Sequence, residues 1–223
     1  MFETKNSQAD SSGATCDRLL DAAGEVFAEQ GFKVATVREI CRRAGANIAA
    51  VNYHFGDKAG LYKATLKYAD RCAVALRGIP SGDGGAEVAP EQMLAMYVRA
   101  YVAAAMDTGR PQWHGRLIAR EIMEPSPALD EVVTENIRPR SEMLGRVVRR
   151  LLGSAATDER VRLTKFSVIG QCLMYHSGRH VMERLHPEQG FGPEAIDGVA
   201  EHITRFSLAA IAGIREQAEG GRR

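Results

Sequence analysis

The sequence predicts an all-α protein. Apolar residues recur three and four positions apart along most of the chain, which is the spacing of an amphipathic helix. No segment shows the alternation of apolar and polar residues that marks a half-buried strand. Apolar residues make up 45% of the 223 positions, which is enough apolar surface for a folded core. This length suits one large domain or two modest ones.

The N-terminal part is predicted to be a flexible arm followed by four helices. Residues 1–14 form the arm, because they are polar and rich in Ser, Asp and Asn. Thr36 is followed three positions later by Glu39, as in a capping box, and Asn47 is a favoured N-cap residue. The predicted helices cover 15–30, the segment opened by Thr36, the segment from Asn47 to about His54, and 58–77.

The C-terminal part is predicted to contain five further helices. A Gly-, Ser- and Pro-rich linker, 78–90, precedes them, and its glycines match no phosphate-binding pattern. Pro139 lies inside the third of these helices and must kink or split it. A short tail, 218–223, follows the last helix. The predicted helices are 91–107, 112–124, 128–152, 158–185 and 194–217.

Residues 36–58 carry the pattern that points to function. They comprise a short helix, a turn at Gly45 and a second short helix, which is the arrangement of a helix-turn-helix. The second helix of this motif can lie in the DNA major groove. Small side chains at Ala46, Ala49 and Ala50 would let its backbone approach the base edges closely.

The charge distribution favours a locally basic surface. The formal net charge of the chain is only +1, which excludes a protein that coats nucleic acid through bulk charge. Residues 33–72 nevertheless carry a net charge of +5, whereas residues 1–32 carry −4. Phosphate contacts need such a basic section, although a solvated helix face has the same composition.

Several short stretches bear a family resemblance. Residues 27–32 read FAEQGF, residues 36–40 read TVREI, and residues 52–62 read NYHFGDKAGLY. Together with Ala44-Gly45, they resemble the N-terminal domain of TetR-type transcriptional regulators over roughly residues 15–72. Within that family, ANIAAVNYHF at 46–55 is most similar to the CecR-like branch. Trp113 and the later REIMEPSP at 120–127 resemble the C-terminal domain of the same branch.

The resemblance implies a TetR-type fold with two domains. A three-helix DNA-binding domain with its connecting helix is expected at 15–77, and a ligand-binding and dimerisation domain at 91–217. The implied function is that of a homodimeric repressor, which binds a near-palindromic double-stranded DNA operator and is released by a small-molecule effector. An activator of the same fold is the alternative. An all-helical enzyme is a more distant one, because the sequence lacks GxSxG, HExxH and paired acid–base patterns.

The resemblance also implies which residues contact DNA. Thr36 should offer its hydroxyl and amide to a phosphate, since helix N-termini favour anions. Tyr53, His54 and Lys58 look like backbone-contacting residues of the family. The four base-facing positions are expected to be Asn47, Ile48, Ala50 and Asn52. Asparagine is suited to adenine, and small apolar groups are suited to the thymine methyl group. Many family members differ at 50–52, so no operator sequence can be transferred.

The last two predicted helices offer more amphipathic surface than one small core needs. We expect 158–185 and 194–217 to pair with a second copy as a four-helix bundle, with packing inside one chain as the alternative. The helices over 91–152, with the first part of 158–185, are expected to enclose an effector pocket, because polar and aromatic residues interrupt their apolar pattern. Surface exposure or internal pairing is the alternative for each of these residues. The expected lining is Met96, Trp113, Arg116, Arg120, Glu121, Gln171, Tyr175 and His176.

Other site classes find little support in the sequence. His176 and His180 lie four positions apart, but no third metal ligand is evident, so neither a metal nor a cofactor is predicted. No apolar run approaches the roughly 20 residues that cross a bilayer, and the N-terminus lacks the features of a secretory signal. We therefore expect a cytoplasmic protein with reduced, buried cysteines at Cys16, Cys41, Cys72 and Cys172. A nonspecific architectural DNA binder is a further alternative.

Overall fold

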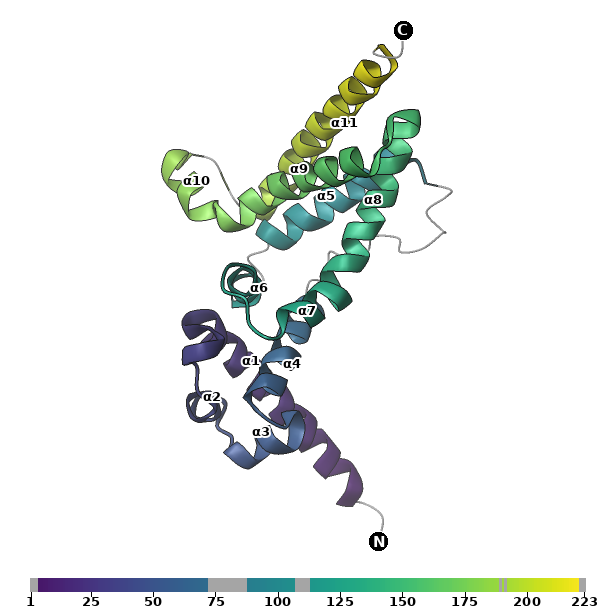
Figure 1. Ribbon diagram of the computed structural model, residues 1–223. Coiled ribbons are helices and arrows are strands. Elements are labelled where there is room, and N and C mark those ends of the chain that lie inside the picture. The colour runs from purple at the N-terminus through teal and green to yellow at the C-terminus, as the bar shows by residue number, and fades with distance from the viewer. Residues whose placement is uncertain (1–3, 72–87, 107–112, 189, 191, 221–223) are drawn as a thin grey trace. The chain divides into compact units, whose positions relative to one another are not determined.

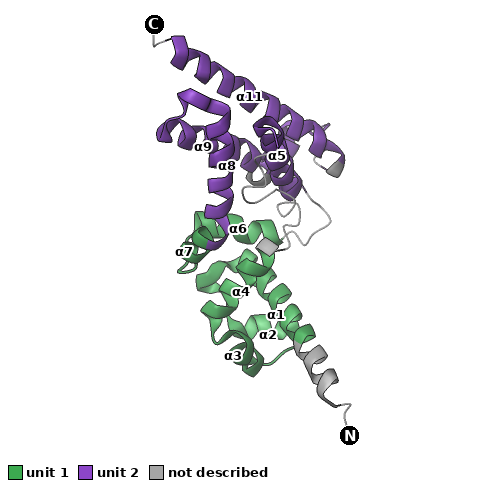
Figure 2. Cartoon of the chain, turned by 90° about the vertical axis from the view of Figure 1, so that its right-hand side faces the viewer, with its two compact units in different colours: residues 1–72, 111–134 green, residues 73–110, 135–223 purple. Residues whose placement is uncertain are grey.

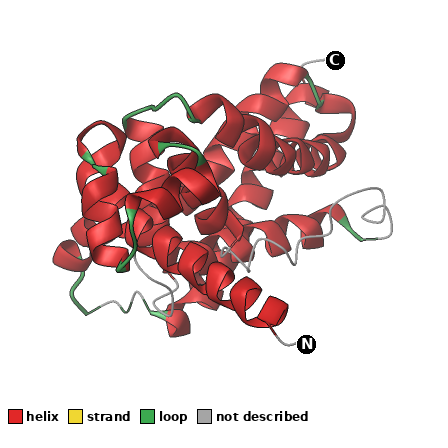
Figure 3. Ribbon diagram, turned by 90° about the horizontal axis from the view of Figure 1, so that it is seen from below, coloured by secondary structure: helices red, strands yellow, loops and turns green. Residues whose placement is uncertain are grey.

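The computed structural model describes residues 4–71, 88–106, 113–188, 190 and 192–220. Over these ranges the chain forms helices joined by turns and short loops, and no strand is present (Figures 1 and 3). The predicted all-α class is therefore confirmed. No helix in the described ranges is both long enough and apolar enough to cross a membrane.

Contacts divide the chain into two compact units (Figure 2). Unit 1 comprises residues 1–72 and 111–134, and unit 2 comprises residues 73–110 and 135–223. Each unit is thus built from two separate stretches of the chain. The sequence analysis placed 111–134 in the second domain, whereas the structure packs this stretch with the N-terminal helices.

Unit 1 holds the segment predicted to be a helix-turn-helix. Its helices are α1 (Thr4–Val34), α2 (Val37–Ala44), α3 (Ile48–Phe55), α4 (Lys58–Arg71), α6 (Trp113–Met123) and α7 (Leu129–Val132). The first helix begins at Thr4, so the segment expected to be a flexible arm is largely helical. Gly31, the predicted stop, has φ 76° and ψ 167° and interrupts the helical geometry inside α1. The predicted end of α4 at 77 and most of the linker lie outside the described residues.

Local capping fixes the short helices of unit 1, as the sequence predicted. The Thr36 hydroxyl accepts a hydrogen bond from the Glu39 amide at 3.2 Å and begins α2. Gly45 ends that helix in the left-handed region, with φ 60°, where glycine is favoured. The Asp57 carboxylate accepts from the Gly60 amide at 2.7 Å at the start of α4. The core beneath these turns includes the fully buried Leu19, Val26, Phe27, Ile40, Val51, Leu61 and Leu66.

Unit 2 is built around one apolar core. Its main helices are α5 (Pro90–Met106), α8 (Arg138–Leu152), α9 (Asp158–Ser177), α10 (Arg179–Leu185) and α11 (Ile196–Gly220). A π-helical turn, Val133–Ile137, separates α7 from α8, so the predicted helix at 128–152 does split just before Pro139. The core includes Leu94, Tyr97, Val98, Leu144, Val148, Leu152 and Ile203.

One predicted helix of unit 2 is wrong in extent. The sequence analysis expected a single helix over 158–185, but α9 ends at Ser177 and α10 begins at Arg179. Gly178 between them has φ −92° and ψ −1°, which departs from α-helical geometry. A side chain at Gly178 would lie 2.7 Å from the Met174 carbonyl oxygen, so the break depends on glycine.

The described cysteines are free thiols. Cys41 and Cys172 are buried, and burial raises the pKa of both, that of Cys172 to about 12. Cys16 is half-buried, and Cys72 lies outside the described residues.

Candidate nucleic-acid interface

The second helix of the motif, α3, leaves most of its surface uncovered. Val51 is its one fully buried residue, and it anchors the helix in the core of unit 1. Tyr53 is 82% exposed and Ile48 is 50% exposed. At these exposures Tyr53 adds little to the core of unit 1, and Ile48 is covered only in part. The geometry therefore offers α3 to a partner.

The eight predicted DNA contacts all lie between the start of α2 and the start of α4, and none is buried. Exposed positions are Thr36, Asn47, Ile48, Asn52 and Tyr53. Half-buried positions are Ala50, His54 and Lys58. This short segment can thus present all eight side chains to solvent at least in part.

The two asparagines of α3 differ in what they can offer a base. The side-chain oxygen of Asn47 accepts from the Ala50 amide at 2.8 Å, so it serves as the N-cap. Its N–H donors stay available to a base, but one of the two lone pairs of its oxygen is used by the cap. Asn52 is exposed and makes no side-chain hydrogen bond to another described residue. Asn52 therefore keeps both the donor and the acceptor that paired contacts with adenine require.

Three residues expected to contact phosphates are held by neighbours. The Tyr53 and His54 rings meet edge to face, with centroids 4.9 Å apart. The Lys58 ammonium donates to the Lys33 carbonyl at 3.2 Å and lies 4.9 Å from the centre of the Phe32 ring. Because an ammonium has three donors, Lys58 retains N–H groups for a phosphate.

The basic segment is less positive at its surface than its sequence suggests. Arg42 and Arg43 both bind the Glu39 carboxylate, at 2.7 and 2.9 Å. Arg43 also binds Glu29 at 2.8 Å. The Arg42 guanidinium, followed by that of Arg43, lowers the pKa of Glu39 to about 2. Glu39 and Glu29 therefore neutralise part of the charge of these two arginines, while the Arg42 side chain stays 70% exposed.

Two further basic residues of the segment 33–72 also form ion pairs. Lys63 and Lys67 on α4 both bind Glu131, each at 2.7 Å. These two ammonium groups lower the pKa of Glu131 to about 2. Both contacts lie within unit 1 and join α4 to α7.

Sequence reasoning missed Arg38 as a candidate phosphate contact. Arg38 lies on α2, is exposed, and has no ion pair among the described residues. Helical spacing could have revealed the difference, because Arg42 and Arg43 stand three and four positions after Glu39 whereas Arg38 stands beside it. Lys33 is also exposed and without an ion pair in the described part of the chain.

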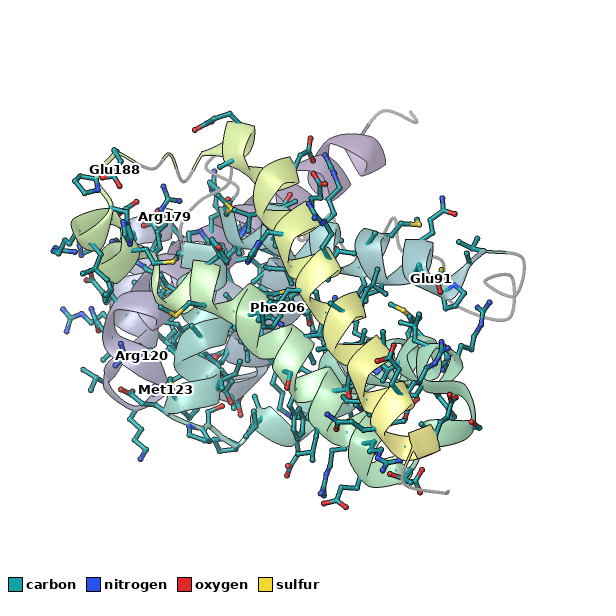
Figure 4. The ribbon with its side chains drawn as sticks, turned by 90° about the horizontal axis from the view of Figure 1, so that it is seen from above. Glu91, Arg120, Met123, Arg179, Glu188 and Phe206 are labelled. Carbon is teal, nitrogen blue, oxygen red and sulfur yellow. The ribbon has the colours of Figure 1, made fainter. Side chains whose placement is uncertain are left out.

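Residues expected in an effector pocket have other partners in unit 1. The Trp113 ring is buried against Gly24, where a Cβ atom would lie 2.3 Å from the ring. The Arg120 guanidinium donates to the Glu29 carbonyl at 3.2 Å and pairs with Glu124 at 3.0 Å. Figure 4 labels Arg120 on α6. The contacts with Gly24 and with the Glu29 carbonyl join α6 to α1.

Glu121 is a buried carboxylate at the centre of unit 1. It is 1% exposed and accepts from the Tyr62 hydroxyl at 2.6 Å. It also accepts from the amide and hydroxyl of Ser126, at 3.0 and 2.9 Å. Burial, and then this carboxylate, raise the pKa of Tyr62. Glu121 therefore joins α6 to α4, while Arg116 is exposed.

The other expected pocket residues belong to unit 2. Gln171 donates to the Ser207 hydroxyl at 3.4 Å, which joins α9 to α11. Met96 and Tyr175 are half-buried, and Tyr175 packs against the apolar core. The side chain of His176 lies outside the described residues. Each unit thus contains four of the eight residues.

Two family models match this chain, one in its N-terminal part and one in its C-terminal part. Residues 19–65 match the bacterial regulatory proteins of the tetR family, and residues 90–211 match the C-terminal domain of the HTH-type transcriptional dual regulator CecR. The chain belongs to the TetR family, in its CecR-like branch. Members of the TetR family are DNA-binding transcriptional regulators that function as dimers, so this chain is a transcriptional regulator of that family.

Individual relatives agree with this assignment. CecR of Shigella flexneri is 30% identical over 177 residues, which cover 74% of this chain and 77% of that protein. SrpR of Pseudomonas putida is 44% identical over 52 residues, 23% of this chain and 24% of SrpR. These relatives are named as transcriptional regulators, which makes an enzyme the less favoured class.

Solved structures share the fold at low sequence identity. HlyIIR, a hemolysin II transcriptional regulator, has a TM-score of 0.61 at 18% identity, over 86% of this chain and 98% of that chain. FadR of Bacillus subtilis, solved with stearoyl-CoA, has a TM-score of 0.61 at 14% identity, over 86% and 97% of the two chains. The TetR-type fold predicted from the sequence is therefore confirmed.

Proposed function

We propose that this TetR-family protein is a ligand-responsive repressor that binds a near-palindromic DNA operator as a homodimer. The observation that carries the proposal is the uncovered surface of α3, where Tyr53 is 82% exposed on a helix that the Asn47 cap holds in place. In this proposal α3 lies in the major groove. Asn52 and Ile48 face bases, while Thr36, Arg38 and Lys58 contact phosphates.

An apolar surface on unit 2 supports the homodimer. Leu163, Phe166, Leu173 and Met174 lie on α9 and are 39 to 60% exposed. Phe206 on α11 is 59% exposed, and Figure 4 shows α11 running alongside α9. Exposed apolar patches of this kind mark interfaces in soluble proteins. A homodimer carries two α3 helices, one for each of two successive half-sites, which lie about 34 Å apart in such complexes.

Effector release would act by linkage. An effector that binds better to the dimer conformation that does not fit DNA lowers operator affinity by that difference in affinity and by no more. Activation is the second candidate, and the description of CecR as a dual regulator favours keeping it. The sign of regulation depends on where the operator lies relative to the promoter.

The decisive experiment is to sequence genomic fragments retained by the purified protein and then to measure affinity for the recovered operator. Tyr53→Ala and Lys58→Ala should weaken binding to every sequence, because they remove backbone contacts. Asn52→Ala should instead change the preference among operator variants, with a cost of about 1–3 kcal/mol on the preferred site. Met123→Ala is the matched control, since Met123 is 81% exposed in the same unit but lies outside the motif.

Three results would contradict the proposal. The protein could retain no fragment, it could bind all duplexes equally, or Tyr53→Ala could bind as the unchanged protein does. Equal binding to all duplexes would favour the architectural class. A reporter gene placed behind the recovered operator then decides between repressor and activator.

A further inference from the structure

A recess on unit 2 has no role in the function proposed above. It lies between α8 and α9 and has a volume of about 400 Å³. Ligand sites in proteins start near 300 Å³, so the recess is large enough for a small metabolite. Its lining comes from the outward sides of the two helices, and it includes none of the residues expected to bind DNA or an effector.

The lining of the recess is predominantly basic. Arg146 and Arg149 contribute from α8, and Arg162 and Lys165 contribute from α9. Only two acidic residues, Glu142 and Asp158, share the lining. Four cations facing two carboxylates leave an excess of positive charge in one concave place.

Two of these cations are already bound and two are not. Arg149 pairs with Asp158 at 2.7 Å, and the Lys165 ammonium donates to the Ser141 hydroxyl at 2.8 Å. Arg146 and Arg162 are exposed and have no ion pair with any described residue. Two unpaired guanidinium groups thus approach the same recess from adjacent helices.

Gly145 contributes to the shape of the recess. A glycine inside a helix makes the helix less stable than an alanine would. The backbone at Gly145 has no positive φ that would require a glycine there. A Cβ atom there would lie 3.4 Å from Cδ of Lys165 and 3.9 Å from Cγ1 of Val161. Because Gly145 has no side chain, the aliphatic part of Lys165 fits beside it and the recess stays open at this point.

We propose that this basic recess, defined by Arg146, Arg149, Arg162, Lys165 and Gly145, binds an organic polyphosphate. The ligand class is a nucleotide-sized metabolite with at least two phosphate groups. A guanidinium group matches a phosphate with two parallel hydrogen bonds, and several such groups on one recess suit an anion of high charge. A monoanion would leave most of these donors unused. The proposal uses residues of unit 2 alone, so it does not depend on the DNA contacts of α3.

The test is calorimetric titration of the 223-residue chain with tripolyphosphate, ADP, AMP and citrate in low salt. Tripolyphosphate and ADP should bind more tightly than AMP, and citrate should bind more weakly than tripolyphosphate. The double variant Arg146→Ala/Arg162→Ala should weaken ADP binding by about tenfold or more, because it removes both unpaired forks. Gly145→Gln should also weaken ADP binding, since it fills the recess without changing its charge.

Two control variants locate the binding. Arg205→Ala removes an arginine that is 80% exposed on α11 of the same unit, and it should leave ADP binding unchanged. Arg38→Ala removes an unpaired arginine of unit 1, and it should also have no effect. A loss of binding with Arg38→Ala alone would move the phosphate site to the DNA-binding segment and overturn the proposal.

Three further outcomes would overturn the proposal of a polyphosphate site. Absence of ADP and tripolyphosphate binding at millimolar concentration would show an ordinary solvated face. Equal binding of citrate and tripolyphosphate would overturn the phosphate class, and an unchanged double variant would overturn the site. Gly145→Gln could unfold at a lower temperature than the unchanged protein. In that case the test relies on Arg146→Ala/Arg162→Ala, because both of these positions are exposed.

Discussion

The two units of the molecule show different chemistry at their surfaces and in their interiors. Unit 1 adds specific polar contacts to its core, such as the buried bond between Tyr62 and Glu121, and it presents a mixed polar and apolar helix to solvent. Unit 2 relies on one large apolar core and leaves Phe166 and Phe206 about 60% exposed. The difference fits the proposed function, in which unit 1 meets a duplex with a charged backbone and unit 2 meets the apolar surface of a second copy.

Breaking the apolar surface of unit 2 should give the largest effect. The double variant Phe166→Glu/Phe206→Glu should convert the dimer to a monomer, because burying each carboxylate costs on the order of several kcal/mol. Light scattering coupled to gel filtration measures the mass, and operator affinity should fall with the dimer. Leu185→Glu adds one such carboxylate at a residue of α10 that is 67% exposed, and it should leave the mass unchanged. A dimer that survives the double variant would show that another surface joins the subunits.

The polar interior of unit 1 should be the next most sensitive feature. Tyr62→Phe removes the hydroxyl that donates to the buried Glu121 carboxylate, and it should lower the free energy of unfolding by about 1–3 kcal/mol. Urea denaturation measures this loss. Adding Glu121→Leu to Tyr62→Phe should lower stability further, because the amide and hydroxyl of Ser126 then also lose their acceptor. Tyr53→Phe, at an exposed position, should stay within about 0.5 kcal/mol of the unchanged protein.

The cap of α3 sharpens the comparison at the DNA-binding surface. Asn47→Ala should cost about 1 kcal/mol of stability, because the Ala50 amide loses its side-chain acceptor and keeps only the Asn47 carbonyl. Asn47→Asp keeps an acceptor and should preserve stability, yet its negative charge should weaken DNA binding. Measuring unfolding and operator affinity on both variants separates the two roles of this residue. If Asn47→Asp binds DNA normally, residue 47 does not approach the duplex.

The smallest expected effect concerns pH. The Arg42 and Arg43 guanidinium groups lower the pKa of Glu39 from 4.5 to about 2 in the folded protein. A lowered folded pKa gives stability that is present above pH 4.5 and is lost as the pH falls toward 2. Because Glu39 is near solvent, added salt should reduce the effect. Acid unfolding of Glu39→Gln should show a shallower slope in this window, and an identical slope would contradict the prediction.

Features that depend on neighbouring residues could be predicted from the sequence. Thr36, Asn47 and Asp57 cap the helices that follow them, and Pro139 marks the split before α8, because each acts within one helical turn. The segment that forms the candidate DNA interface was identified for the same reason. Its motif is contiguous, so local spacing contains the whole pattern.

Features that depend on distant residues could not be predicted. Tyr62 and Glu121 are 59 positions apart, and Arg120 reaches a carbonyl 91 positions away. An apolar period shows that a side chain is covered, but it does not name the covering partner. The pairing of Lys63 and Lys67 with Glu131 has the same cause. The pairing of Arg42 and Arg43 with Glu39 and the break at Gly178 are local, and a count of charges and an apolar pattern that continues across the break overlooked them. The roles of the eight DNA contacts and the eight effector-pocket residues stay predictions.

The assembly of unit 1 from two stretches has a practical consequence for recombination between family members. A chimaera that takes only residues 1–72 from another regulator would place Trp113 and Arg120 opposite foreign side chains where Gly24 and Gly31 now leave room. Residues 1–72 of another regulator should therefore pack poorly against residues 111–134 of this chain. A functional chimaera must exchange residues 111–134 together with residues 1–72. The unit that can be exchanged is therefore encoded by two separate stretches of the gene.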